Sequence, residues 1–102
     1  MKPCVLRPQA AQDRRDEVRF YRKEAGPKVA LKLVDALEEA LQLLQINPAI
    51  GSPTMGQTLA VTGMRTWRID GFPLSFWYFE REAHLDIARL VGHRQDADNI
   101  DV

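Results

Sequence analysis

Apolar residues recur most regularly between positions 28 and 46 of this chain. Their spacing of three or four residues is the period of one face of an α-helix. The stripe consists of Ala30, Leu33, Leu37, Ala40, Leu41 and Leu44, and Val34 widens it. Asn47-Pro48 follows, and proline cannot continue a helix because it lacks the backbone N–H donor. The pattern therefore predicts an amphipathic helix over residues 28–46.

An earlier stretch, residues 9–25, has the same period. Its recurring positions are Ala11, Arg14, Val18, Tyr21 and Ala25. Gly26-Pro27 separates the two stretches; glycine suits the end of a helix and proline suits the first turn of the next one. Such a short connection predicts an antiparallel helical hairpin. Neither helix is apolar all round, so both stripes must pack against other elements.

The remaining apolar runs have the character of strands. Residues 4–6 form a short first run, and residues 64–70, 74–80 and 84–93 form three more, separated by short turns. Short turns between strands predict an antiparallel meander. The last run is apolar on both faces, which is typical of a strand that is covered on both sides at that point or is central in the sheet. Residues 47–63 contain repeated prolines and glycines and are expected to form a long loop.

The order of these elements, β-α-α-β-β-β, predicts an α+β fold. The simplest arrangement has two layers, with the helical hairpin packed on one face of a mainly antiparallel four-stranded sheet. A chain of 102 residues has the size of one domain. We expect a single domain over residues 1–102, with residues 96–102 as a flexible acidic tail. The core of so short a chain is small, so a binding partner is a plausible source of further stability.

The formal net charge is zero, but the charges are unevenly distributed. Residues 2–32 contain nine basic side chains against four acidic ones, whereas the segment after Arg94 contains three aspartates and no base. This distribution predicts one basic face and one acidic end. Proteins that grip a nucleic-acid backbone usually carry a clear basic excess. The neutral balance therefore argues against a nuclease. We also expect no direct, sequence-specific binding of nucleic acid by this chain alone.

Several kinds of site are not indicated by the sequence. The two histidines, His84 and His93, have no neighbours at the spacing of metal ligands. No serine nucleophile motif and no glycine-rich phosphate loop is present, so we expect neither a metal nor a cofactor. The single cysteine, Cys4, allows no internal disulfide. No apolar run approaches the ~18–20 residues that span a membrane and no signal-peptide pattern begins the chain, so a cytoplasmic location is expected.

The remaining candidates for chemistry are arginine, histidine and aromatic residues on the sheet. The strand period of two places Arg65, Trp67 and Ile69 on one face of the run 64–70, and Arg68 on the opposite face. We expect Trp67 and Ile69 to face the helices, which directs Arg68 to the open face.

Two interpretations of these residues stay open. The aromatic residues of the second strand, Trp77 among them, either fill the core and a partly covered surface, or converge with Arg68 and with His93 or Arg94 on a ligand. Exposed aromatics beside arginine suit a protein interface and also the stacking of nucleobases. A third possibility for His93 alone is that it hydrogen-bonds the end of the sheet.

The order and spacing of motifs resemble the ParE family of bacterial type II toxin–antitoxin systems over nearly the whole chain, more closely than the related RelE family. The matching pieces are the basic first helix with Val18 and Tyr21, the helix Ala30 to Leu44, Asn47-Pro48-Ala49-Ile50-Gly51, Met64-Arg65, Gly71-Phe72-Pro73 before the aromatic strand with Tyr78, and Arg89-Leu90-Val91-Gly92-His93-Arg94-Gln95-Asp96.

The resemblance implies a toxin that a cognate antitoxin neutralises, with the C-terminal segment of the antitoxin wrapping the helices and the sheet edge in a hetero-oligomer. Characterised ParE-like toxins act on DNA gyrase, whereas RelE-like toxins are ribosome-dependent mRNA endonucleases. The candidate residues for target binding are Arg65, Arg68, Trp77, His93 and Arg94. Those for antitoxin binding are Tyr21, Val34 and Leu43.

Three features favour a gyrase inhibitor over an enzyme. The net charge is zero, residues 47–63 contain no lysine, and the segment after His93 ends in acids rather than in a tyrosine with basic neighbours. The alternative is a ribonuclease in which His93 is the general acid or base and Arg65, Arg68 or Arg94 stabilises phosphate charge. A second alternative is a binding module of the same fold without toxicity.

Overall fold

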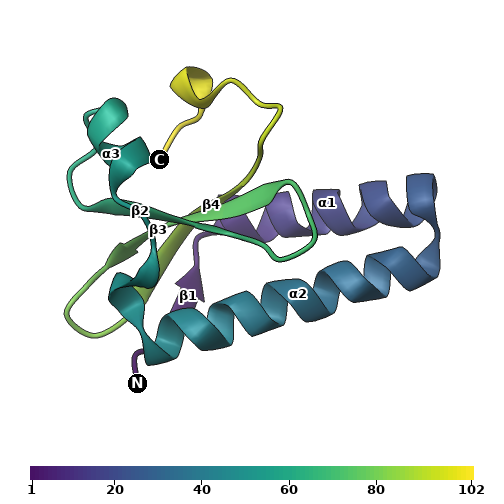
Figure 1. Ribbon diagram of the computed structural model, residues 1–102, viewed down its shortest axis with the longest axis horizontal. Coiled ribbons are helices and arrows are strands. Elements are labelled where there is room, and N and C mark those ends of the chain that lie inside the picture. Colours follow the sequence, from purple (N-terminus) through teal and green to yellow (C-terminus); the bar gives the residue numbers. More distant parts are fainter.

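The computed structural model describes residues 1–102 and has the predicted order of elements (Figure 1). The main elements are β1 (Cys4–Leu6), α1 (Pro8–Ala25), α2 (Pro27–Ile46), β2 (Met64–Arg68), β3 (Leu74–Glu80) and β4 (Leu85–Gly92). The fold is α+β, as predicted. No helix is both long enough and apolar enough to cross a membrane.

The four strands form one mixed sheet in the order β1-β4-β3-β2. The β2–β3 and β3–β4 pairs are antiparallel, and β1 lies parallel to β4. The mainly antiparallel sheet is therefore confirmed. The hairpin of α1 and α2 lies along one side of this sheet (Figure 1).

The apolar stripe of α2 is buried as its period predicts. The buried residues of this helix are Ala30, Leu33, Leu37, Ala40, Leu41 and Leu44, and Val34 beside them is half-buried. The junction of the two helices is Gly26, whose φ is +93°. A residue with a Cβ rarely adopts this conformation, so glycine permits the abrupt reversal between the helices.

The main core lies between the hairpin and the sheet. It is a cluster of 13 buried residues, in which Leu33, Leu37 and Leu44 of α2 meet Phe76 and Tyr78 of β3 among others. Trp67 packs against the edge of this cluster, and Ile69 is fully buried in it. The expectation that both residues face the helices is confirmed.

A second, smaller cluster lies on the opposite face of the sheet. Its five buried residues are Met64, Trp77, Phe79, Ala88 and Val91. The side chains packed over it are Met55, Leu59 and Val61 from one segment and Ala97 and Ile100 from the C-terminal tail. Figure 1 shows both segments on the side of the sheet away from the hairpin. The face that was expected to be open is therefore partly covered.

The run between α2 and β2 is more regular than the predicted loop. It contains a 3₁₀ turn at Pro48–Ile50 and the one-turn helix α3 (Thr54–Thr58). Ser52 forms an isolated antiparallel bridge with Thr66 of β2. Elements of three to five residues are too short to produce a visible period in the sequence, which is why the glycines and prolines indicated only a loop.

The C-terminal tail has local structure. It forms a 3₁₀ turn at Ala97–Asn99 and returns across the sheet. The Asp96 carboxylate accepts a hydrogen bond from the Asp98 amide, which caps this turn. Ala97 and Ile100 of this mainly acidic segment pack on the second cluster, whereas Val102 is exposed.

A β-bulge explains why β4 is apolar on both faces. Trp77 pairs with Arg89 and Tyr78 pairs with Ile87, so Ala88 is an extra residue in β4. Ile87 packs in the main core and Ala88 in the second cluster. The prediction that this strand is covered on both sides is confirmed.

Candidate functional site

His93 lies directly after β4 and closes the end of the sheet. Its backbone amide donates a hydrogen bond to the Pro73 carbonyl (2.9 Å). Its Nδ1 lies 3.5 Å from an Arg68 Nη1 and its Nε2 lies 2.9 Å from the Ser75 Oγ. Because arginine can only donate, Nδ1 is the acceptor, so the neutral ring carries its proton on Nε2 and donates it to Ser75. The fold thus brings Arg68 and His93 together, and it gives His93 a sheet-closing role.

A hollow of about 220 Å³ lies beside the His93 ring. Its lining residues are Met55, Thr66, Ser75, Trp77, Val91, Gly92, His93, Gln95 and Ala97. Trp77 is only 3 % exposed, so its ring forms a wall of this hollow instead of projecting from the surface. The second strand therefore does not offer Trp77 as a free ring beside Arg68.

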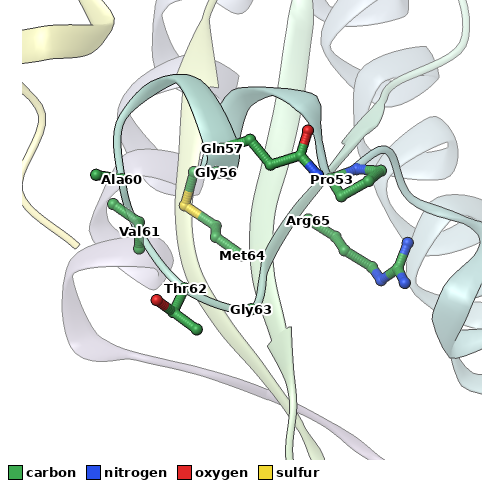
Figure 2. Close-up of a pocket in the computed structure, with 9 residues that line it drawn as sticks. All are labelled: Pro53, Gly56, Gln57, Ala60, Val61, Thr62, Gly63, Met64 and Arg65. Carbon is green, nitrogen blue, oxygen red and sulfur yellow. The ribbon is translucent and has the colours of Figure 1, made fainter.

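Arg65 holds the segment before β2 in place. Its Nη1 donates to the carbonyls of Ala49 (3.2 Å) and Gly51 (2.7 Å). Arg65 also lines a hollow of about 400 Å³ next to α3, and Figure 2 shows its guanidinium pointing away from the bend around Val61. It is the single charged residue of that hollow, which therefore has no acid–base pair.

Arg94, in contrast, is exposed and makes no hydrogen bond or ion pair. Arg68 is exposed as well, and its one side-chain contact is the long one to His93. Both guanidinium groups are therefore accessible to an external carboxylate.

Tyr78 connects β3 to the 3₁₀ turn that follows α2, a role that the sequence did not reveal. Its side chain is fully buried, and its hydroxyl donates to the Pro48 carbonyl (2.7 Å) and accepts from the Gly51 amide (2.9 Å). Burial raises the pKa of Tyr78 above its ordinary value, so the hydroxyl stays neutral. A Cβ at Gly51 would collide with this hydroxyl. The signal in the sequence was the pairing of Asn47-Pro48-Ala49-Ile50-Gly51 with a tyrosine in an apolar strand.

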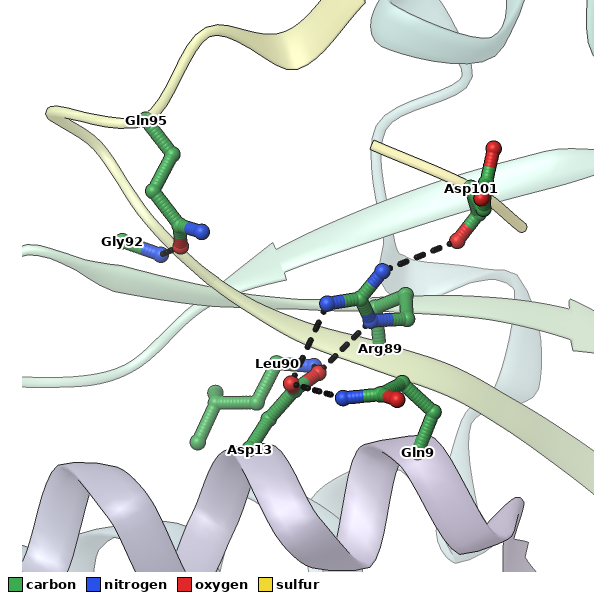
Figure 3. A network of polar contacts seen from close by, with 7 residues as sticks. All are labelled: Gln9, Asp13, Arg89, Leu90, Gly92, Gln95 and Asp101. Atoms are coloured by element: carbon green, nitrogen blue, oxygen red, sulfur yellow. Dashed lines mark hydrogen bonds and ion pairs between the residues drawn. The ribbon is translucent and has the colours of Figure 1, made fainter. Parts of the chain in front are cut away.

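Asp13 of α1 connects the hairpin to β4 (Figure 3). Arg89 donates to both Asp13 oxygens, from Nε at 2.7 Å and from Nη2 at 3.1 Å, and the Leu90 amide donates at 3.1 Å. Because β1 pairs with β4 only as far as Ile87, it offers no carbonyl to the Leu90 amide. The Asp13 carboxylate accepts that hydrogen bond instead. Burial alone would raise the pKa of Asp13, but the hydrogen bonds from Arg89, Leu90 and Gln9 hold it below its ordinary value.

Asp86 forms the second charged junction, at the start of β4. It accepts two hydrogen bonds from Arg7, both 2.9 Å long, and further ones from Arg81. The hydrogen bonds from Arg7 are the main reason that the pKa of Asp86 falls from 3.8 to about 2. The two guanidinium carbons also lie over the Phe79 ring, at 5.5 Å for Arg7 and 4.6 Å for Arg81. Arginine therefore borders the second cluster.

This fold and these residues match a known family. The family model described as the ParE toxin of the type II toxin–antitoxin system, parDE, matches residues 4–97. The chain belongs to the ParE toxin family. A solved structure described as the chromosomal ParDE TA system from P. aeruginosa is similar to it, with 26 % identity and a TM-score of 0.75 over 90 % of this chain and 96 % of that one. No curated protein matches the chain. The resemblance inferred from the motifs is confirmed.

In this ParE-family chain, the three residues expected to bind an antitoxin lie in separate places. Val34 lines a hollow of about 440 Å³ between the helices. Leu43 is 38 % exposed and lines another hollow, with Trp67 and Arg68. Tyr21 is half-buried and packs edge-on against Phe72, with the ring centroids 5.2 Å apart.

The hollow at Val34 has the most distinctive lining. Its apolar residues are Leu6, Ala11, Val18 and Val34, and its charged residues are Arg14, Arg15, Arg19 and Arg22. Of these arginines, only Arg14 forms an ion pair, with Glu38 at 2.8 Å. The basic face that the charge distribution predicted is therefore an arginine-lined groove with an apolar floor.

Proposed function

We propose that this ParE-family toxin inhibits DNA gyrase by stoichiometric binding and not by catalytic turnover. The observation that carries the proposal is that Arg65, Tyr78 and His93 already have partners inside the fold, while the two accessible groups, Arg68 and Arg94, are arginines and supply no general acid or base. Arg65 is bound to two carbonyls, the Tyr78 hydroxyl is buried and fully bonded, and both ring nitrogens of His93 have partners.

A general acid or base must reach the proton that it transfers. Tyr78 cannot do so because it has no exposed surface. His93 would have to leave Ser75 and Arg68 first, and no carboxylate bonds to its ring to orient it for catalysis. The site therefore lacks the linked acid, base and orienting group that active sites contain.

The accessible groups suit the recognition of a protein instead. Arg68 and Arg94 are exposed at one end of the sheet, and arginine is enriched at the energetically important positions of protein interfaces. In this proposal both arginines engage carboxylates of the target. His93 orients Arg68, and Trp77 and Arg65 support the surface from behind.

We also propose that a cognate antitoxin neutralises the toxin by occupying the arginine-lined groove. Three arginines without ion pairs surround an apolar floor there, and this combination fits a segment with acidic and apolar residues on one face. A disordered segment that folds in the groove would bury Val34, and contacts beyond it would reach Tyr21 or Leu43. The complex should then be more heat-stable than the isolated toxin; equal thermal stability would contradict this part of the proposal.

A gyrase assay tests the target. Purified toxin is titrated into a supercoiling reaction, and cleaved DNA trapped with gyrase is measured. We expect inhibition near stoichiometric amounts, at most a few-fold weaker in His93→Ala, because His93 only orients Arg68, and clearly weaker in Arg68→Glu. Normal supercoiling at large toxin excess, with no cleaved DNA, would remove gyrase as the target.

A ribosome assay tests the alternative reaction. The same proteins are incubated with translating ribosomes, and the mRNA is examined for cuts. A general acid contributes roughly 10²–10⁴-fold to a rate, so a nuclease that uses His93 would lose its activity clearly in His93→Ala. We expect no cuts from either protein. Cuts that disappear in the variant would establish the ribonuclease.

A further inference from the structure

The C-terminal tail covers the second apolar cluster with few contacts of its own. Ala97 and Ile100, three positions apart, pack on the cluster but stay half-exposed. Beyond Gln95, one hydrogen bond joins the tail to the sheet. Arg89 Nη1 donates it to the Asp101 carbonyl at 3.1 Å (Figure 3). The other tail bonds are local, such as those that Asp96 accepts. Segments with so few buried contacts open at low free energy.

The surface beneath the tail differs from an ordinary exposed surface. Trp77 of β3 and Val91 of β4 line the same hollow as Ala97 of the tail, and they are 3 % and 5 % exposed while covered. Opening the tail would uncover part of this aromatic and aliphatic surface. Contiguous apolar surface of this kind on a soluble protein marks a site of protein interaction.

The rim of the same face is basic. Arg89 pairs with Asp13 through Nε and Nη2 and reaches the tail only through Nη1, and the Arg7 and Arg81 guanidinium groups lie over the Phe79 ring. Asp86 pairs with both Arg7 and Arg81, but its single negative charge offsets only one of their two positive charges. The tail matches this surface because its sequence, Asp96-Ala97-Asp98-Asn99-Ile100-Asp101, alternates acids with the two packed apolar residues.

We propose that this face of the sheet is a docking surface that the tail occupies in the free toxin. Its external occupant is a short acidic segment of the target protein that presents two apolar side chains three residues apart, as Ala97 and Ile100 are presented. The tail then acts as an internal competitor, and its release uncovers the surface. The inference rests on the proposed function in that the segment belongs to the toxin's target.

The competition has a quantitative consequence. When only the open fraction of the toxin can bind, the apparent dissociation constant is the intrinsic constant divided by that fraction. Replacing Ile100 by aspartate removes an apolar contact and places a charge over the apolar cluster, which should raise the open fraction roughly tenfold. Binding of the external segment should strengthen by up to that factor.

The first experiment follows the tail in the full chain alone. The chain has two tryptophans, so Trp67→Phe leaves Trp77 as the single fluorophore. Ile100→Asp is compared with Val102→Asp, which adds the same charge at an exposed position two residues away. We expect acrylamide to quench Trp77 clearly more strongly in Ile100→Asp only, with both circular dichroism spectra unchanged. Equal quenching in the two variants contradicts the release of the tail.

The second experiment tests docking without any assumption about the target. The probe is the synthetic peptide of residues 95–102, added at about 1 mM, where weak segments bind. We expect it to restore the protection of Trp77 in Ile100→Asp, whereas the same peptide with aspartate in place of Ile100 has no effect. If neither peptide protects Trp77, the surface does not accept an external segment and the proposal is wrong.

The third experiment connects the surface to gyrase. Ile100→Asp should inhibit supercoiling at a concentration up to about tenfold lower than Val102→Asp. A less potent Ile100→Asp would mean that the tail itself binds the target, which contradicts its role as a competitor. If neither variant inhibits gyrase but the peptide protects Trp77, the docking surface stands and the choice of gyrase as target fails.

Discussion

The two faces of the sheet are built very differently. The face under the helical hairpin contributes to a core of 13 buried residues, and the opposite face holds a cluster of five. The first is covered by helices of 18 and 20 residues, and the second by a helix of five residues and an acidic tail. Burial scales with the apolar area removed from water. The hairpin face therefore contributes most of the stability, and the other face, with its smaller cluster and shorter covering segments, contributes less.

The distribution of arginines follows the same division. Arg65 and Arg89 are committed to partners inside the fold. Arg68 and Arg94, at the end of the sheet, are exposed and form no ion pair. A charged side chain that holds the fold together is not available to a partner, so the accessible pair is where target binding is expected.

The largest effect should come from breaking the hairpin face. Leu37→Ala removes a fully buried side chain and should lower the free energy of unfolding by about 2–5 kcal/mol. Ile100→Ala, on the other face, should lower it by less than about 1 kcal/mol because that side chain is half-exposed. Urea unfolding measures both. Equal losses would mean that the tail is part of the stabilising core.

The next effect concerns the junction between the two layers. Asp13→Ala leaves Arg89, 16 % exposed, without its carboxylate and the Leu90 amide without an acceptor. We expect a loss of about 2–3 kcal/mol. Asp16→Ala is the matched control, because Asp16 is an exposed aspartate on the same helix, three residues after Asp13. If the two variants unfold at the same urea concentration, the Asp13 network contributes nothing to stability.

A smaller effect is expected from the acid at the rim of the second face. The folded-state pKa of Asp86 is about 2, against an ordinary 3.8. A lowered folded pKa means that the ionised group stabilises the fold above the unfolded pKa, and that this contribution is lost as the pH falls from about 4 to about 2. Its size should be about 1 kcal/mol, because Arg7 and Arg81 are 36 % and 47 % exposed and solvent screens them.

The comparison of the wild type with Asp86→Asn isolates this contribution. Thermal unfolding at pH 5.5 should show the variant to be less stable, and at pH 2 the difference should shrink towards zero. Asp13 titrates in both proteins, so its effect cancels. A difference that stays constant across this range would show that the ion pairs with Arg7 and Arg81 are not its source.

The sequence predicted the hairpin face well because its signals are periodic. The stripe from Ala30 to Leu44 and the alternation around Trp67 each follow from one element and are independent of distant residues. The junction at Gly26-Pro27 was equally local. The short turns predicted that β2, β3 and β4 are neighbours, but the place of β1 beside β4 did not follow from these local signals.

The second face was predicted poorly because it depends on contacts between distant segments. The bulge at Ala88 is visible only when β3 and β4 are paired. The tail lies on the sheet through Ala97 and Ile100, two apolar residues in a mostly acidic segment. The position of Trp77 in a strand indicated its face but not that Met55 and Ala97 would line the same hollow.

The smallest effect on stability should come from the accessible arginine at the sheet end, together with a clear effect on the target. Arg94→Glu changes an exposed side chain without partners, so unfolding should shift by no more than about 0.5 kcal/mol. Lys28→Glu is the matched control, because it makes the same change of charge at an exposed position at the start of α2.

If the sheet end contacts gyrase, Arg94→Glu should weaken inhibition while Lys28→Glu does not. The size of the loss in binding free energy locates the contact. A loss of a few kcal/mol would place Arg94 in a desolvated contact, and a loss well under about 1 kcal/mol would place it at the rim. Equal inhibition by the two variants would move the target contact away from the sheet end, leaving the surface under the tail as the remaining candidate.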